Sequence, residues 1–320
     1  MDSLFSLRAV TAAAIGLCLP MLSTTALAAQ AGTRPFQMSL LATTDYAYNA
    51  PVDIPIFTRN VFSPYQDQPA GPSIAWLPPS ADLDRHKIDW TRIVAVYVDE
   101  PYGEFMKQRK SCEGLPPDIL AQLKETTAQL EAMATALRAK APATRFWVNF
   151  TRSEIELMLD PAARCPFNQP YIDVISMDIY GRDFYPKINR LYQKLYKHRA
   201  TPHQQLALVP GTFTGGYENQ TGEEGAARLS GYFKFAGRMN RRCNLPLGPT
   251  GPTGFYDGCP VWIVAGWIGG KTPYHEKPHY YAPIENPDSK PVLDAWEKQI
   301  AIPRIVPKHA PPRRQARRMH

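Results

Sequence analysis

Two adjacent carboxylates follow directly on an apolar, β-branched run in the first half of the chain. The run IVAVYV over residues 93–98 leads into Asp99 and Glu100, and then into Pro101 and Tyr102. Since proline ends a strand, this segment either caps a turn with polar residues or delivers an acid to a pocket. In a pocket, burial and the neighbouring Asp99 charge would raise the pKa of Glu100 and suit it to general acid chemistry.

Side chains alternate along a strand, so Asp99 and Glu100 cannot both face the same way if the strand continues. We expect Pro101 to end the strand and aim Glu100 into a cleft. Asp99 then turns toward a helix N-terminus or loop amides.

Other chemistry-bearing residues follow later apolar runs. Asp178, alone inside ISMDIYG, would be a costly buried charge unless it serves a site or an ion pair, and it is the candidate second carboxylate. Glu218 in the loop GGYENQTGEEG is the fallback, with a solvated loop acid as the alternative. Trp267 suits a stacking platform or a core position. The candidate residues for binding substrate are Asp99, Tyr102, Asn149, Tyr180, Glu218 and Trp267.

Strand and helix patterns alternate along most of the chain. We expect strands over residues 36–42, 73–77, 93–98, 145–150, 171–181, 205–213 and 261–270, and helices over 116–139, from near 153, and over 188–197, 222–240 and 290–300. Near-continuous apolar strands separated by helices predict parallel strands covered on both faces. A single domain over residues 30–303 suits a (β/α)₈ TIM-type barrel, irregular in its N-terminal third. An open doubly wound sheet is the alternative, although no glycine-rich phosphate loop follows a strand.

In such a barrel the carboxyl ends of the strands meet at one rim, where acids, an amide and aromatic residues would gather. That mixture is typical of a sugar-binding cleft, because aromatic faces stack on C–H surfaces while acids and amides bind hydroxyls. At these ends the sequence resembles the glycoside hydrolase-like (β/α)₈ barrel superfamily. If VYVDEPY closes strand four, SMDIYG falls on strand six and AGWIGG on strand eight.

The resemblance implies cleavage of a poly- or oligosaccharide by two carboxyl groups, with Glu100 as the acid/base, Asp178 as its partner and no cofactor. One strand departs from the pattern. LALVPGTF carries Thr212 where many retaining relatives place a nucleophilic Glu. A barrel that binds carbohydrate without cutting it, and an envelope scaffold, therefore remain alternatives.

The N-terminus and the cysteines point to export. Residues 1–29 carry one Arg, a short apolar core and a small-residue site, which predicts a signal peptide; a helix that stays attached is the alternative. No later stretch reaches the ~20 apolar residues of a membrane span. We expect a periplasmic or secreted protein.

Four cysteines remain outside the expected signal peptide, and they allow three pairings. In an oxidising compartment we favour Cys112–Cys165 and Cys243–Cys259, because each pair joins loops expected at one end of the fold. Four free thiols are the alternative.

Charge and spacing exclude other partners. The net charge is +7, but residues 304–320 contribute six Lys and Arg and no acid, leaving 7 − 6 = +1 for the rest. The nearly neutral charge of the chain outside residues 304–320 therefore predicts no nucleic-acid binding. The Pro-rich basic tail is expected to be disordered and to contact anionic envelope surfaces weakly. No cysteine or histidine spacing suits a metal. We expect a monomer whose partner is a carbohydrate.

Overall fold

We describe a computed structural model of the chain over residues 37–43, 58–62, 73–84, 87–178, 185–210, 221–242, 259–269, 291 and 294–295. The expected signal peptide over residues 1–29 and the basic tail over 304–320 lie outside these ranges. Most residues of the helix expected over 290–300 do so as well.

The described elements alternate between strands and helices from β3 onward. The strands are β1 (Gln37–Thr43), β2 (Thr58–Phe62), β3 (Ser73–Trp76), β4 (Ile93–Asp99), β5 (Arg145–Thr151), β6 (Val174–Asp178), β7 (Gln205–Leu208) and β8 (Val261–Gly269). The helices are η3 (Trp90–Arg92), α2 (Gly103–Met106), α3 (Pro117–Lys140), α4 (Arg152–Leu159), α5 (Tyr185–Lys197), α6 (Gly222–Met239) and η6 (Asn240–Arg242).

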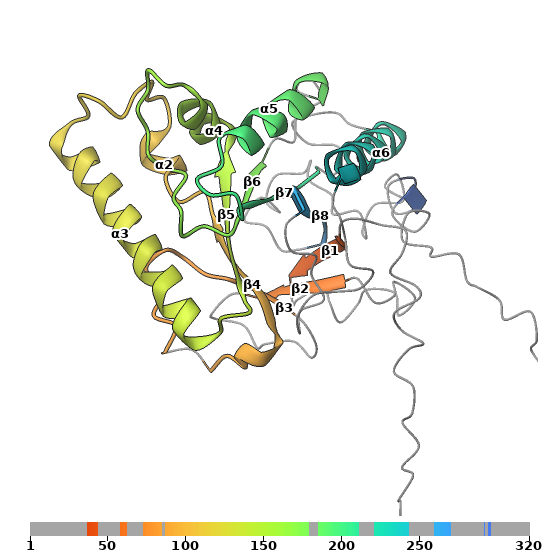
Figure 1. Cartoon of the computed structure of the whole chain (residues 1–320), viewed down its shortest axis with the longest axis horizontal. Coiled ribbons are helices and arrows are strands. Elements are labelled where there is room, and N and C mark those ends of the chain that lie inside the picture. The colour runs from red at the N-terminus through yellow and green to blue at the C-terminus, as the bar shows by residue number, and fades with distance from the viewer. Residues whose placement is uncertain are drawn as a thin grey trace, which may run out of the picture.

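This part of the chain is an α/β fold built on parallel strands. Six strands, β3 to β8, form a curled half-barrel in which each strand pairs in parallel with the next. Helices α2 and α3 connect β4 to β5, and α4, α5 and α6 connect the following strands. Figure 1 shows these helices on the outside of the curled strands. β1 pairs in parallel with β8 at one edge of this half-barrel, β2 pairs in parallel with β3 at the opposite edge, and β1 and β2 pair in parallel with each other. The predicted parallel α/β arrangement is confirmed.

The strands of the half-barrel are buried on both faces, as their apolar runs predict. On β4, Val96 belongs to the cluster packed against the helices, whereas Tyr97 belongs to the cluster inside the curl. Inside, an edge-to-face chain runs from Trp76 to Tyr97, Trp147 and Trp262, with ring centroids 6.1, 4.9 and 5.7 Å apart. Edge-to-face pairs stabilise the fold by more than the burial of their surface area alone, so this chain of rings helps to fix the interior of the curl.

Several element boundaries differ from expectation. The strand expected over residues 171–181 is confined to Val174–Asp178, and the one over 205–213 to Gln205–Leu208. Strand β2 and the short helix α2 were not predicted, because neither has an apolar period long enough to stand out. No described helix combines the length and the apolarity that crossing a membrane requires.

One predicted disulfide is confirmed. Cys112, between α2 and α3, is bonded to Cys165 in the loop after α4. This bond ties together the segments that follow β4 and β5, and a disulfide is compatible with an exported protein. Cys259 is buried just before β8, and Cys243 lies outside the described residues, so the second pairing stays a prediction.

Candidate active site

A cleft of ≈ 920 Å³ opens at the carboxyl ends of β3, β4 and β5. Its volume is at the upper end of the ~300–1,000 Å³ typical of small-molecule sites. The strand register accounts for its position, since Trp76 pairs with Tyr97 and Asp99 pairs with Asn149. The described residues that line it are Trp76, Leu77, Pro78, Pro79, Asp99, Glu100, Gly103, Glu104, Lys107, Thr151 and Ser153.

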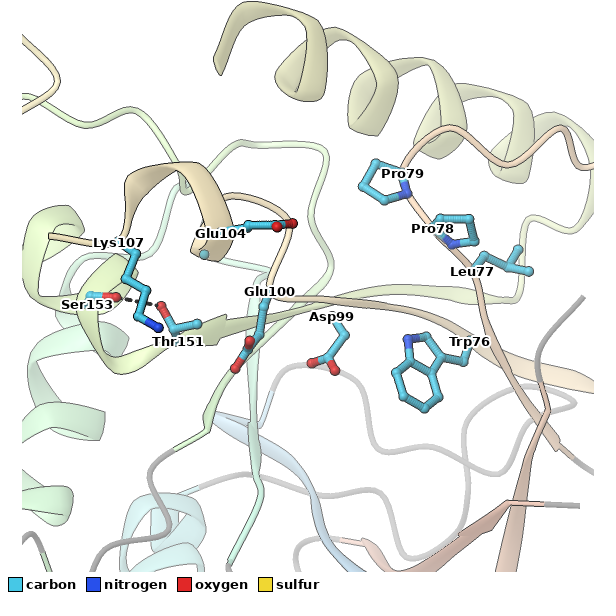
Figure 2. Close-up of a pocket in the computed structure, with 11 residues that line it drawn as sticks. Trp76, Leu77, Pro78, Pro79, Asp99, Glu100, Glu104, Lys107, Thr151 and Ser153 are labelled. Carbon is cyan, nitrogen blue, oxygen red and sulfur yellow. Dashed lines mark hydrogen bonds between the residues drawn. The ribbon is translucent and has the colours of Figure 1, made fainter. Parts of the chain in front are cut away.

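The cleft has two walls of different chemistry. Figure 2 shows Trp76 and the Leu77–Pro79 segment on one side, and Lys107, Thr151 and Ser153 on the other. Asp99 and Glu100 lie between the two walls. The hydroxyls of Thr151 and Ser153 are hydrogen-bonded at 3.0 Å. A ligand in this cleft would therefore meet an apolar surface on one side, a polar surface on the other and carboxyl groups in between.

The backbone at Glu100 brings its side chain to this cleft. Glu100 ends the ladder by donating its N–H to the carbonyl of Asn149 at 2.9 Å, and its own carbonyl accepts from the N–H of Gly103 at 3.1 Å. Pro101 stands at the second position of the resulting turn, where its fixed φ is favoured. Glu100 itself has φ 41°, in the left-handed region that costs free energy for any residue except glycine.

Asp99 also faces the cleft, so the expectation that it turns toward a helix N-terminus or loop amides was wrong. Its Oδ1 accepts hydrogen bonds from Tyr97 Oη at 2.8 Å and from Asn149 Nδ2 at 2.9 Å. Tyr97 and Asp99 are two residues apart and share the inner face of β4. Alternation holds through Asp99, and only the left-handed backbone after it lets Glu100 reach the same cleft.

The Asp99 interaction extends into the interior of the curl. Asn149 Oδ1 accepts from Ser176 Oγ at 2.5 Å, and Ser176 Oγ accepts from Trp147 Nε1 at 2.7 Å. Asn149, Trp147 and Ser176 are fully buried. A satisfied buried network of this kind fixes its members in one arrangement. These contacts from the interior of the curl therefore hold the Asp99 carboxylate in a defined orientation.

The acids at the cleft have raised pKa values. Desolvation, followed by the charge of Asp99, raises the pKa of Glu100 from 4.5 to about 7. Desolvation also raises the pKa of Asp99, against the hydrogen bonds from Asn149 and Tyr97. Glu100 keeps an exposed side chain, so water screens part of its interaction with Asp99. A carboxyl group with this pKa can both donate and accept a proton near neutral pH.

A third acid, Glu154, lies buried directly behind the cleft. Its Oε1 accepts from the N–H of Tyr102 at 2.7 Å and its Oε2 from the N–H of Thr151 at 2.5 Å. Desolvation raises its pKa to about 7, against the hydrogen bonds from Thr151 and Tyr102, while the charge of Glu100 adds to the increase. Thr151 is the N-cap of α4, and its side chain accepts from the N–H of Glu154 to complete a capping box.

Gly103 allows the turn to approach β5. A Cβ at this position would lie 2.9 Å from Thr151 Cγ2, 3.4 Å from Glu100 Cβ and 3.7 Å from Glu100 Oε2. Real Cβ atoms do not make contacts as short as 2.9 Å, so only glycine fits without a shift.

Two of the predicted binding residues do not reach the cleft. Tyr102 is fully buried: its ring stacks on Phe167 with centroids 4.5 Å apart, and its hydroxyl is hydrogen-bonded to Thr127 at 3.1 Å. The turn after Glu100 directs Tyr102 into the outer layer, so its assignment to substrate binding was wrong. Asn149 is also fully buried, and its Nδ2 donates to Asp99 Oδ1, so it supports Asp99 from the interior.

The structure describes other predicted residues only in part. The backbone of Asp178 ends β6 and pairs with Thr151, which lines the cleft, and Trp267 lies within β8. The side chains of both lie outside the described part of the structure, as do Tyr180 and Glu218 entirely. Their assignments stay predictions.

The sequence interpretation missed several cleft residues. Trp76, Glu104 and Lys107 line the cleft, but they lie on a short strand, on a one-turn helix and directly after that helix, where no strong pattern marks them. Glu154 had a usable signal, because Thr-x-x-Glu before an apolar run predicts a capping box. Thr151 and Glu154 fit that pattern.

Comparison with models of protein families finds no match, and comparison with curated proteins finds no significant match. Within the described ranges, no group of three or more His, Cys, Asp or Glu residues is arranged to hold a metal ion.

Proposed function

We propose that this protein is an exported glycoside hydrolase that cleaves a poly- or oligosaccharide. In this proposal Glu100 is the general acid/base and Asp178 is the partner carboxylate. We further propose that β1 and β2 complete a (β/α)₈ barrel with the six strands of the half-barrel, as in the glycoside hydrolase-like superfamily. Export then follows from removal of residues 1–29.

The observation that carries the proposal is the contrast among the three acids at the cleft. Asp99 accepts two hydrogen bonds and Glu154 accepts two backbone N–H groups, and such donors stabilise the ionised form. Within the described residues, no hydrogen bond is donated to the Glu100 carboxylate, and the Asp99 charge lies beside it. Glu100 and Glu154 both have a pKa of about 7, but Glu154 is fully buried whereas Glu100 lines the cleft, so we assign the transferable proton to Glu100. Neighbouring carboxyl groups with divergent environments are a mark of acid/base assignment.

The walls of the cleft support a carbohydrate as the ligand. Sugar rings present C–H faces and hydroxyl edges, and the cleft offers Trp76 with Pro78 and Pro79 opposite Thr151 and Ser153. Aromatic and proline surfaces can take a C–H face, while hydroxyls and charged groups exchange hydrogen bonds with the edge. We propose that Trp76 contributes the stacking surface beside the acids, in addition to any contribution from Trp267.

In the proposed mechanism, Glu100 donates its proton to the glycosidic oxygen as the bond to the leaving group breaks. Asp178 acts on the opposite side of the sugar ring. A carboxyl separation of about 5–5.5 Å between Glu100 and Asp178 would give retention, and one of about 6.5–9.5 Å would give inversion. Asp99 keeps Glu100 protonated and contributes negative charge near the oxocarbenium-like transition state.

The test is a screen of the purified mature protein against bacterial and plant polysaccharides, read by release of reducing ends. Glu100→Gln should lower turnover at least ~100-fold and leave glycan affinity unchanged, because glutamine keeps the shape but has no transferable proton. Glu125→Gln is the matched control. Glu125 is an exposed glutamate on α3 whose Oε1 accepts from Gln129 at 3.1 Å, so this variant should retain wild-type turnover.

Each result distinguishes among the alternatives. Equal turnover in Glu100→Gln and the wild type would reject Glu100 as the acid. Binding without turnover on any polysaccharide, weakened by Trp76→Ala, would instead identify a carbohydrate-binding protein that does not cut. No binding to any glycan would reject the carbohydrate proposal and leave the envelope scaffold.

A further inference from the structure

Glu154 makes contacts that helix capping alone does not account for. At the start of α4 its Oε2 accepts from the N–H of Thr151, which is the ordinary capping-box contact. Its Oε1 accepts from the N–H of Tyr102, 52 residues away in the turn that follows β4. One fully buried carboxylate therefore joins the segments after two neighbouring strands.

The chain has a second capping box for comparison. At the start of α6, Thr221 accepts from the N–H of Glu224 at 3.2 Å and Glu224 Oε2 accepts from the N–H of Thr221 at 3.1 Å. Glu224 thus occupies the same N3 position and makes the same local contact as Glu154. In the box on α6, Thr221 is exposed and Glu224 is half-buried, whereas Glu154 is fully buried against the turn that carries Glu100.

The hydrogen bond to the Tyr102 N–H constrains the backbone next to Glu100. Tyr102 lies two residues after Glu100, inside the turn closed by the hydrogen bond from Gly103 N–H to the Glu100 carbonyl. On its far side Tyr102 is anchored by the stacked ring of Phe167. The turn is thus fixed at its backbone by Glu154 and at its side chain by the outer layer, while Glu100 carries a strained left-handed φ. Strain of this kind persists only when the surrounding structure holds it.

We propose that Glu154 is a positioning residue that fastens the turn after β4 to the start of α4 and so fixes the Glu100 carboxyl group in the cleft. This rests on the proposed function only in that Glu100 is taken as the acid. The hydrogen bonds from the Tyr102 and Thr151 amides to Glu154 hold the two segments together. Gly103 contributes by permitting the close approach to Thr151 that lets one carboxylate span both amides.

Glu154 also interacts electrostatically with the site. The charge of Glu100 adds to the raised pKa of Glu154. The other charged or titratable groups near this point are Asp99, Glu104 and Lys107 in the cleft and Tyr102 in the turn. The charge that contributes to the raised pKa of Glu100 is that of Asp99, so Glu154 acts on Glu100 through the backbone contacts.

The test compares Glu154→Gln with Glu224→Gln. In Glu154→Gln one oxygen still accepts from an amide, but the new amino group faces the other N–H, so one of the two segments is released. We expect hydrogen exchange at the Tyr102 and Gly103 amides to accelerate at least ~10-fold, because local opening becomes easier. Turnover should fall ~10–100-fold with KM changed less than ~3-fold, because a misplaced acid affects the transition state more than binding.

Glu224→Gln should leave all of these quantities at wild-type values. Unchanged amide exchange in Glu154→Gln, or equal changes in the two variants, would overturn the proposal. If the wild type cuts no glycan, the proposed function fails, but amide exchange still decides the role of Glu154. If Glu154→Gln does not fold, the wild-type protein decides it: a protected Tyr102 amide supports the contact, and one that exchanges as fast as an unstructured amide overturns it.

Discussion

Replacement of Asp99 by asparagine should lower the pKa of Glu100 by a limited amount. That pKa is about 7 against an ordinary 4.5, a difference of about 2.5, and it has two causes, of which desolvation is larger than the Asp99 charge. Removing the charge should therefore lower the pKa by less than half of that difference, or less than about 1.25, to a value still near 6. Asparagine keeps an oxygen that can accept from Tyr97 and Asn149, so the network should survive.

The assay is a ¹³C NMR titration of the glutamate carboxyl groups in the wild type and in Asp99→Asn, with Glu100 assigned by its absence in Glu100→Gln. Asp160→Asn is the control, because Asp160 is exposed beyond α4 and should leave Glu100 unchanged. If Glu100 is the general acid, activity falls as pH rises through its pKa, so the basic limb of the pH–rate profile should move down by the same amount. A wild-type Glu100 that titrates near 4.5, or one that titrates identically in Asp99→Asn, would refute the electrostatic account.

Two further predictions concern the segments around the cleft. Gly103→Ala places a Cβ against Thr151, so it should lower the free energy of unfolding by about 1–3 kcal/mol and reduce turnover ~10–100-fold. The control is Gly237→Ala on α6, where a Cβ meets nothing within 4 Å, and this variant should have unchanged or higher stability. Removing the Cys112–Cys165 disulfide, which spans 53 residues, by the double serine variant should lower the free energy of unfolding by about 4 kcal/mol. Urea denaturation measures the free energy of unfolding of each variant. A Gly103→Ala variant as stable and active as the wild type would contradict the steric argument. A double serine variant whose free energy of unfolding lies within about 1 kcal/mol of the wild-type value would contradict the disulfide argument.

The parallel strands and much of the site's position could be predicted from the sequence. Near-continuous apolar runs such as residues 93–98 require cover on both faces, and helical periods between them supply it. Parallel strands then bring their carboxyl ends to one edge, which accounts for Asp99 and Glu100 arriving at a cleft. The Cys112–Cys165 pairing followed from the same reasoning about shared ends and is confirmed.

The direction of individual side chains could not be predicted in the same way. Alternation says that neighbours on a strand point oppositely, yet it does not say that Glu100 adopts a left-handed backbone and joins Asp99 in the cleft. Tyr102 was assigned to substrate from its type and position, but the turn carries its ring into the outer layer against Phe167. A turn reverses direction within a few residues, and its course depends on what it packs against.

Local pattern therefore determined where this protein has strands and helices and which polar residues end them, because periodicity and turn preferences act over a few residues. The tertiary structure decided which of those residues share a cleft and how far the pKa of each acid is shifted. Glu154 reaches the amide of Tyr102 across 52 residues, and the interior network holds Asp99 from two other strands. Desolvation and hydrogen bonds to a charge depend on neighbours brought together only by folding, so no local stretch of sequence contains them.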